Sequence, residues 1–169
     1  MSEVILEAAD EAAIPVHALT EADTPAFLEA ASALAKGAAR LAEFKGKAGQ
    51  AVTVLSPDGG TEQVLFGLGA DPDPMAFRGL PAKLAAGTYR IAKAPAAVRP
   101  EEAALAFALG SYRFDRYKSR DAQRPRLVAE SVDAAEIRQV AHACALARDM
   151  VNTPANDMGP LQVESQIGN

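Results

Sequence analysis

Aromatic residues are scarce in this 169-residue sequence: they make up 5% of the chain, and tryptophan is absent. Hydrophobic residues nevertheless account for 49%, and much of that fraction is alanine. This length suits one domain, with or without a short appendage, that buries roughly 70% of its unfolded surface. The composition argues against a large aromatic binding platform and favours helices that pack through small side chains.

Cysteine and histidine are almost absent as well, which limits the chemistry available to the chain. Cys144 is the only cysteine, so an internal disulfide is excluded, and this is compatible with a reducing compartment. Two histidines, His17 and His142, are too few for most metal sites and catalytic triads. His142 and Cys144 stand two residues apart in an expected helix and point to different sides, which is a poor arrangement for chelating one ion. We expect both histidines to be structural or exposed.

Positive charge and long apolar runs are also lacking. Seventeen Lys and Arg residues against 22 Asp and Glu give a formal net charge of -5, whereas nucleic-acid binders are more often basic. The longest apolar runs, such as AALAFALG, are far shorter than the ~18–20 residues that cross a bilayer. The acidic start MSEVILEAAD lacks the basic and apolar regions of a signal peptide. We therefore expect a cytoplasmic protein without a membrane partner.

Several short segments rich in apolar and β-branched residues predict strands. These are Ile14–Leu19, Ala51–Leu55, Glu62–Gly69, Thr88–Lys93 and Pro125–Glu130. The turn sequence SPDGG follows the second of them and predicts a hairpin with the third. Because helical segments interleave with these strands, the sequence predicts an α/β domain with a mixed sheet.

The first predicted helix begins with Thr24 as N-cap and Pro25 as its first residue, and Gly37 is a point at which it can divide. Its apolar residues recur at spacings of four and three, which predicts one buried face. That face consists of Phe27, Ala31, Leu34, Ala38 and Leu41. Further helical segments are predicted over Met75–Leu84 and Glu101–Phe114.

The last long helix is predicted to open at Asp133, with Glu136 completing a capping box. Its apolar face is predicted to consist of Ile137, Val140, Cys144, Ala147 and Val151. Asn152 and Pro154 are expected to end it, because Asn tolerates the left-handed conformation and Pro cannot continue a helix. Gly159 and Pro160 then suit the N-cap and first residue of a new helix.

The loop GLGADPDP, Gly67–Pro74, is the first candidate binding site. Two glycines after a strand could let backbone amides approach a phosphate. The third glycine of the dinucleotide fingerprint is absent, however, and Asp71 and Asp73 would repel an anion. These two aspartates alone also form a poor cage for a cation that takes six or more oxygens. A plain turn is the favoured interpretation.

The segment Gly110–Arg126 is the second candidate, because it holds six of the 17 basic residues, interleaved with Tyr112, Phe114 and Tyr117. Bases could stack on these rings while the basic side chains hold phosphates. Asp115 and Asp121 dilute the charge, and the aromatic spacing continues an apolar helix face. We favour a helix end followed by a solvated loop, with a nucleic-acid contact as the alternative.

Two segments resemble the leucyl (cytosol) aminopeptidase family. LGSYRFDRYKS, Leu109–Ser119, resembles the segment that closes the N-terminal domain in that family, and ARDMVNTPANDMGP, Ala147–Pro160, resembles the passage into its catalytic domain. FKGKAGQ, followed by VLFGLG, occurs in the expected order. The resemblance implies a macro-domain-like mixed sheet flanked by helices over residues 1–131. It also implies that residues 132–169 form a connecting helix and the first turns of the catalytic domain.

The family consists of metallopeptidases that remove N-terminal amino acids with two divalent metals, zinc or manganese, and that form hexamers. Its catalytic motifs, similar to GKG…FDSGG and NTDAEGR, do not occur in this sequence. The resemblance therefore implies a chain truncated before the catalytic domain, with no catalytic, cofactor-binding or metal residue of its own. The implied role is assembly or regulation, with the catalytic domain and the subunits of a homo-oligomer as partners. Two alternatives remain: a macro-like nucleotide or ADP-ribose pocket near Gly67–Asp73, and a nucleic-acid contact through Arg113–Arg126.

Overall fold

The computed structural model describes residues 4–8, 13–117, 124–130 and 132–167. Its strands are β1 (Ile5–Leu6), β2 (Ile14–Thr20), β3 (Ala51–Leu55), β4 (Thr61–Gly69), β5 (Gly87–Lys93) and β6 (Pro125–Val128). Its α-helices are α1 (Asp23–Ala30), α2 (Ala33–Leu41), α3 (Pro100–Gly110), α4 (Ala134–Asn152) and α5 (Pro160–Ile167). Short 3₁₀ helices are η1 (Pro74–Gly79), η2 (Pro81–Lys83) and η3 (Ala155–Asp157). No described helix is long and apolar enough to cross a membrane.

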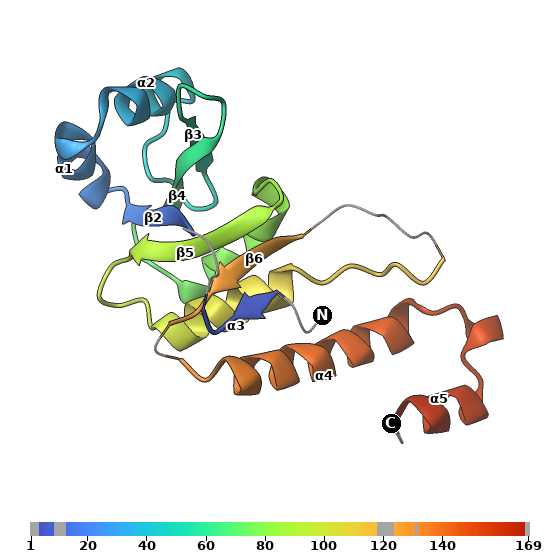
Figure 1. The fold of residues 1–169 in the computed structure, drawn as a ribbon. Coiled ribbons are helices and arrows are strands. Elements are labelled where there is room, and N and C mark those ends of the chain that lie inside the picture. Colours follow the sequence, from blue (N-terminus) through green and yellow to red (C-terminus); the bar gives the residue numbers. More distant parts are fainter. Residues whose placement is uncertain (1–3, 9–12, 118–123, 131, 168–169) are drawn as a thin grey trace.

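The strands form one six-stranded sheet in the order β1-β6-β5-β2-β4-β3 (Figure 1). All neighbours in the sheet run parallel except β3 and β4, which form the predicted antiparallel hairpin. Helices cover both sides of the sheet, so the prediction of a mixed α/β sheet flanked by helices is confirmed. β1 was not predicted, because its two paired residues are too few to give a periodic pattern.

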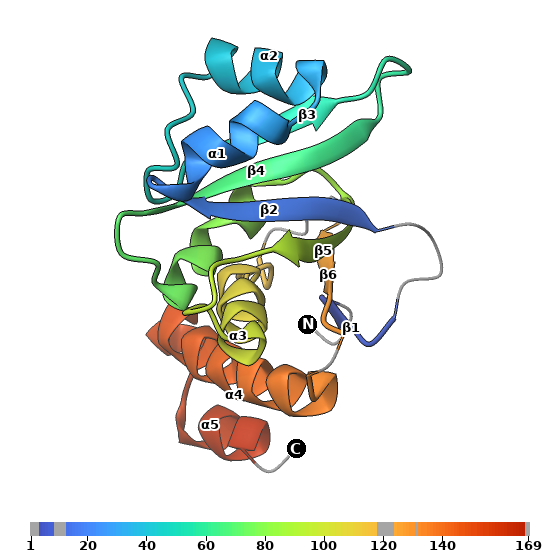
Figure 2. The ribbon, with the colours of Figure 1, turned by 90° about the vertical axis from the view of Figure 1, so that its left-hand side faces the viewer.

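The inner face of the sheet carries the main core and packs against η1, α3 and α4 (Figure 2). Phe66 and Phe77 meet there with ring centroids 5.4 Å apart, and Phe107 of α3 is completely buried. Five buried residues of α3 are alanine or phenylalanine, so this helix lies close to its neighbours. The alanine-rich composition thus produces the expected close helix packing.

The outer face carries a smaller core beneath α1 and α2. Its buried residues belong to β2, β3, β4, α2 and the loop that follows α2; they are Leu19, Ala35, Ala39, Phe44, Val52, Val54 and Leu65. Figure 2 shows α1 and α2 on the side of β3 and β4, away from β5 and β6. Among the described helices, none covers the outer face of β5 and β6 apart from α1, whose Phe27 lies against Lys93 at the end of β5.

The predicted start and division of the first helix are both wrong. α1 begins at Asp23, whose backbone N–H donates to Thr20 Oγ1 at 3.0 Å, while Thr24 lies inside the helix and donates its hydroxyl to the Thr20 carbonyl. The division falls at Ser32, whose hydroxyl accepts a hydrogen bond from Ala35 N and caps α2. A side-chain cap therefore starts the second helix, and Gly37 remains inside it.

Two other helix predictions need correction. The segment Met75–Leu84 forms the two 3₁₀ helices instead of one regular helix, because prolines open both pieces. The helix predicted over Glu101–Phe114 ends at Gly110, where a Cβ atom would lie 2.1 Å from the Arg78 carbonyl oxygen. The aromatic residues after Gly110 consequently do not continue the apolar face of α3.

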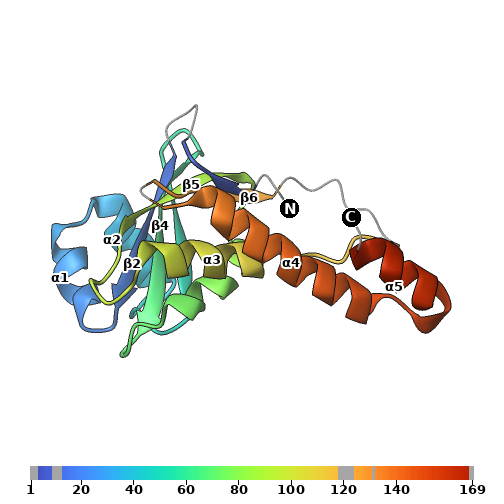
Figure 3. The ribbon, with the colours of Figure 1, turned by 90° about the horizontal axis from the view of Figure 1, so that it is seen from below.

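Helix α4 begins as predicted, with Asp133 accepting a hydrogen bond from Glu136 N at 2.9 Å. Of its predicted buried face, Ile137 is buried, whereas the other buried residues are Ala134, Ala141 and Ala145. Its far half extends beyond the sheet towards α5 (Figure 3). The helix ends at Asn152, as predicted, and Asn152 keeps a negative φ, so it does not use a left-handed conformation to do so. Thr153, extended before Pro154, ends the helix.

Candidate functional site

The two segments that carry the family resemblance lie side by side in the structure. The chain leaves α3 at Gly110 and runs through Ser111–Tyr117 along the C-terminal half of α4. Hydrogen bonds connect residues 37 to 40 positions apart in the sequence. We call this contact between Leu109–Tyr117 and Arg148–Asp157 the junction.

Tyr112 is the centre of the junction. Its hydroxyl donates to Asp149 Oδ1 at 2.6 Å and accepts a hydrogen bond from Asn152 Nδ2 at 3.0 Å. Burial and, secondly, the hydrogen bond to Asp149 raise the pKa of the Tyr112 hydroxyl. Tyr112 therefore remains a protonated donor at neutral pH and holds the last turn of α4.

Arg148 joins the two helices from the other side of the same ring. Its guanidinium lies 5.2 Å from the centroid of the Tyr112 ring and donates to the Leu109 carbonyl at 2.8 Å. That carbonyl belongs to the last turn of α3, where helix carbonyls lack partners within the helix. Arg148 thus gives a free carbonyl at the end of α3 a hydrogen-bond donor. It also places a positive charge at the negative end of the α3 helix dipole.

Three further contacts extend the junction outward. Arg116 donates to Thr153 Oγ1 at 3.5 Å, and Tyr117 donates to Asp157, which raises the pKa of Tyr117. Arg124 and Asp115 form a half-buried ion pair with a 2.6 Å contact. Most of the described polar and aromatic residues in the predicted loop therefore make contacts with other residues of the same chain.

A cleft of about 510 Å³ lies between this segment and α4. Among the described residues, its walls include Arg113, Asp115 and Asp149, but no serine, cysteine or histidine that could act as a nucleophile or base. In the described part of the chain no group of three His, Cys, Asp or Glu side chains could hold a metal ion. The pair of divalent metals implied by the family does not fit these residues, and the junction has the chemistry of a structural contact.

In the loop Gly67–Pro74, the glycines serve backbone hydrogen bonds and close packing. Gly67 N donates to the Gln50 carbonyl and Gly69 N to the Gly46 carbonyl, each at 2.8 Å. A Cβ atom on Gly67 would lie 2.2 Å from the Lys47 carbonyl oxygen, so this glycine allows a close approach of two backbone segments. Asp73 caps η1 by accepting from Met75 N. The two glycine amides are therefore not free to hold a phosphate.

The basic segment is not gathered on one surface. Arg116 and Arg124 belong to the junction, whereas Arg126 lies on the outer face of β6 and donates to Thr88 Oγ1 at 3.1 Å. Phe114 and Tyr117 pack edge to face with centroids 5.8 Å apart, so these rings contact each other. Residues 118–123, which include Asp121, lie outside the described residues.

Neither histidine meets the cysteine in a cluster. His142 is exposed on α4, and Cys144 is half-buried two residues further on. His17 lies on β2 against Phe27, with ring centroids 4.9 Å apart. Burial, followed by the charges of Lys93 and Arg90, lowers the pKa of His17, so its ring is neutral at pH 7.

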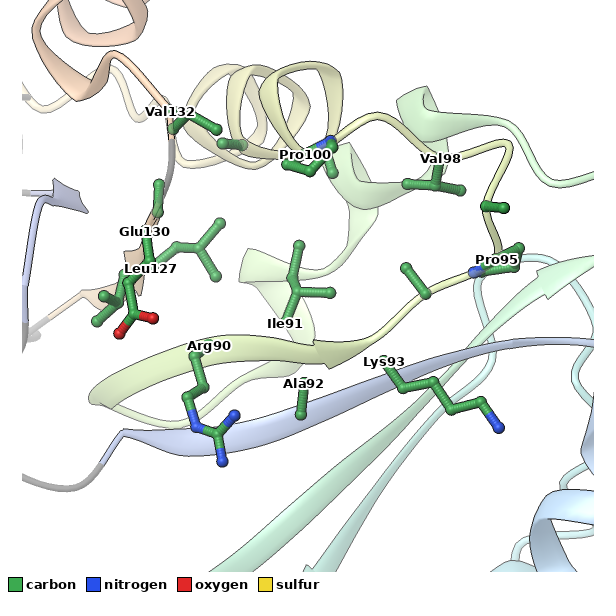
Figure 4. A pocket seen from close by; sticks show the side chains of 16 residues that line it. Arg90, Ile91, Ala92, Lys93, Pro95, Val98, Pro100, Leu127, Glu130 and Val132 are labelled. Atoms are coloured by element: carbon green, nitrogen blue, oxygen red, sulfur yellow. The ribbon is translucent and has the colours of Figure 1, made fainter.

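A second cavity, of about 420 Å³, opens at the carboxyl ends of β5 and β6 beside the start of α3 (Figure 4). Ligands of open α/β sheets often bind in this position. The walls here are mainly apolar, and Ile91 points inward while Arg90 and Lys93 point to the opposite side of β5. Glu130 is the one acidic residue among those that line it, so the cavity lacks convergent polar groups for a specific ligand.

The sequence reasoning did not single out Arg148 or Asp149, although both lie in the segment that carries the resemblance. Two adjacent charged residues, after a stretch from Gln139 to Ala147 without Lys, Arg, Asp or Glu, were the available signal. Their partners are 37 and 39 residues away, a separation that no local spacing reveals.

Comparison with solved structures defines the class of the fold. The structure superimposes on the cytosol aminopeptidase of Coxiella burnetii with a TM-score of 0.85 and 26% identity, covering 98% of this chain and 36% of that enzyme. The bottromycin maturation enzyme BotP in complex with Mn gives a TM-score of 0.63 and 25% identity, over 94% of this chain and 36% of BotP. The architecture is that of an aminopeptidase N-terminal domain.

The family follows from the sequence comparison. Residues 14–130 match the family model of the M17 aminopeptidase N-terminal domain, so the chain belongs to that family. A probable cytosol aminopeptidase of Afipia carboxidovorans is 33% identical over 155 residues, which cover 75% of this chain and 31% of the relative. The chain thus spans about a third of the length of the proteins that it matches.

Proposed function

We propose that this chain acts as the non-catalytic N-terminal assembly domain of an M17-type metallo-aminopeptidase. Residues 1–131 form the domain proper, and residues 132–169 connect it to the catalytic domain. In the whole enzyme the catalytic domain supplies the two divalent metals, zinc or manganese, and the residues that release N-terminal amino acids. The proposed enzyme is cytosolic and homo-oligomeric.

The observation that carries this proposal is a second apolar stripe on α4. Ala134, Ile137, Ala141 and Ala145 attach the helix to the domain. Val140, Cys144, Ala147 and Val151 recur at spacings of four and three along another side of the same helix. Val140 is 41% exposed and Val151 84% exposed, so this stripe faces away from the domain.

Exposed apolar surface continues from α4 into α5, the segment that would lead into the catalytic domain. Leu161 of α5 is 75% exposed, and α5 lies beyond the sheet at the far end of α4 (Figure 3). Exposed apolar surface of this kind is typical of a contact with another protein surface. The junction holds α4 rigidly to the domain, so a catalytic domain docked on the stripe would keep a constant position relative to the N-terminal domain.

A chimera tests this role. The 169-residue chain replaces the N-terminal segment of the Coxiella burnetii cytosol aminopeptidase, and we expect the fusion to assemble to the size of that enzyme and to release N-terminal leucine. Val140→Asp with Val151→Asp should reduce assembly and activity about tenfold or more, because two charges enter an apolar contact. Sedimentation and a leucine p-nitroanilide assay measure both effects.

The matched control is Ala135→Asp with Gln139→Asp, which adds the same charges to exposed positions on the other side of α4. Assembly and activity of this control should stay within about twofold of the unmodified fusion. Equal behaviour of the two double variants would contradict the proposed contact through the stripe.

A further inference from the structure

Apart from the contact of α1 with Lys93, no described helix covers the outer face of β5 and β6, and three of its exposed side chains are basic. Arg90 and Lys93 project from β5 on the side opposite the cavity (Figure 4), and both are exposed. Arg126 of β6 is exposed and lies diagonally across from Arg90, two register positions away, because Thr88 pairs with Arg126 and Arg90 with Val128. We call Arg90, Lys93 and Arg126 the basic face.

These three cations have no carboxylate partner within the described residues. The described ion pairs join Arg99 to Glu101 and Glu102, Arg124 to Asp115, and Arg138 to Glu7. On the basic face, Arg126 contacts only the Thr88 hydroxyl, and the Lys93 ammonium lies 5.3 Å from the centroid of the Phe27 ring. Three unpaired positive charges thus gather on one surface of a chain whose net charge is -5.

His17, which lies beside the basic face, is an independent indication that a contact is missing there. It pairs with Lys93 across β2 and β5, and its buried Nδ1 has no hydrogen-bond partner in the described structure. Arg90 and Arg126 place like charges on the neighbouring strands β5 and β6, which destabilises a sheet, and the buried unpaired nitrogen of His17 adds a further cost. A negatively charged partner on this face would remove the first of these costs.

We propose that the basic face is a docking surface for an acidic polypeptide segment, whose carboxylates pair with Arg90, Lys93 and Arg126. The uncovered width of two strands, spaced about 4.8 Å apart, suits one helix or one extended segment. Two of the three cations are arginine, a residue that is enriched in protein–protein interfaces. The three cations are too few for tight nucleic-acid binding, which typically uses about 6–10 phosphate contacts.

NMR titration of the two histidines tests the surface. His17 adjoins Lys93 on the outer face of the sheet, whereas His142 is exposed on α4, across the sheet, and serves as an internal control. Addition of an oligo-glutamate peptide at low ionic strength should shift the His17 resonances saturably and leave those of His142 in place. The pKa of His17 should also rise, because the bound carboxylates offset the charges of Lys93 and Arg90.

Charge-reversal variants distinguish binding at the basic face from an effect of the net charge of the protein. Arg90→Glu, Lys93→Glu and Arg126→Glu together should weaken peptide binding about tenfold or more. The glutamine versions of the same three changes should also weaken it, without introducing new repulsion. Lys36→Glu, Lys45→Glu and Lys47→Glu alter the net charge by the same amount at exposed positions elsewhere, and this control should retain binding within about twofold.

Several results would overturn the proposal. One is the absence of a saturable His17 shift, and another is an equal loss of binding in the lysine control. Tighter binding of a short DNA duplex than of the peptide at the same salt concentration would assign the face to nucleic acid instead. Saturation by inorganic pyrophosphate at a similar concentration, with displacement of the peptide, would assign it to a small anion.

Discussion

Gly110→Ala is expected to lower the free energy of unfolding by about 3 kcal/mol, the largest effect of any single methyl addition that we propose. The added Cβ would lie 2.1 Å from the Arg78 carbonyl oxygen and 2.7 Å from the Arg78 carbonyl carbon. These are backbone atoms of η1, so relief requires α3 and η1 to move apart within the main core. Chemical denaturation followed by circular dichroism measures the change.

The chain supplies a matched control of opposite sign. Gly37 lies inside α2, and a methyl group added there would have no neighbouring atom within 4 Å, so Gly37→Ala should stabilise the protein by about 0.5–1 kcal/mol. The two substitutions are chemically identical and differ only in their surroundings. A Gly110→Ala variant as stable as the Gly37→Ala variant would show that α3 and η1 do not meet as described.

Arg148→Met is expected to release the C-terminal half of α4 from the domain. The substitution removes the hydrogen bond to the Leu109 carbonyl and the contact with the Tyr112 ring. A hydrogen bond to a charged group contributes about 1.5–3 kcal/mol, so local opening of the helix end should become about 30-fold more frequent. Hydrogen exchange of the amides between Ala145 and Thr153 reports this opening directly.

Arg113→Met provides the control for this experiment, because Arg113 is exposed and makes no hydrogen bond or ion pair with a described residue. Its exchange rates over α4 should match those of the unmodified chain. If Arg148→Met and Arg113→Met gave the same protection of α4, the junction would not be what holds this helix.

The strands could be predicted from the sequence because local signals agree with the tertiary structure. AVTVL is rich in β-branched residues, SPDGG is a strong turn sequence, and the strand after it is apolar throughout most of its length. Their pairing as the hairpin of β3 and β4 follows directly. The start of α4 could be predicted for the same reason, since Asp133 caps its own neighbouring residues.

The errors arose where distant residues decide the outcome. Helix α4 has two apolar stripes, and the sequence cannot show which one the domain covers. The prediction joined Ile137 to the stripe of Val140, whereas the sheet and α3 bury the alanine-rich side. The helix predicted to run past Gly110 ends there beside Arg78, a neighbour 32 positions earlier in the chain. Thr20, whose hydroxyl accepts a hydrogen bond from Asp23 N three residues later, is also the last residue of β2, and its capping role was therefore missed.

The junction shows how the two segments that carry the resemblance are related in the structure. Leu109–Ser119 and Ala147–Pro160 are distant in the sequence, yet their described parts contact each other through Tyr112, Arg148 and Asp149. A change on one side of such a contact affects the other, so both segments are constrained together. The remaining two thirds of the relatives' length has no counterpart in this chain.

The most direct test of the account is an aminopeptidase assay of the purified 169-residue chain. The protein is incubated with Mn²⁺ or Zn²⁺ and leucine p-nitroanilide, and metal content is measured after gel filtration. We predict a folded protein that retains no stoichiometric metal and releases no p-nitroaniline above the background without protein. Turnover that co-purifies with the chain, requires added metal and is abolished by a chelator would contradict the central claim that this domain is not the catalytic one.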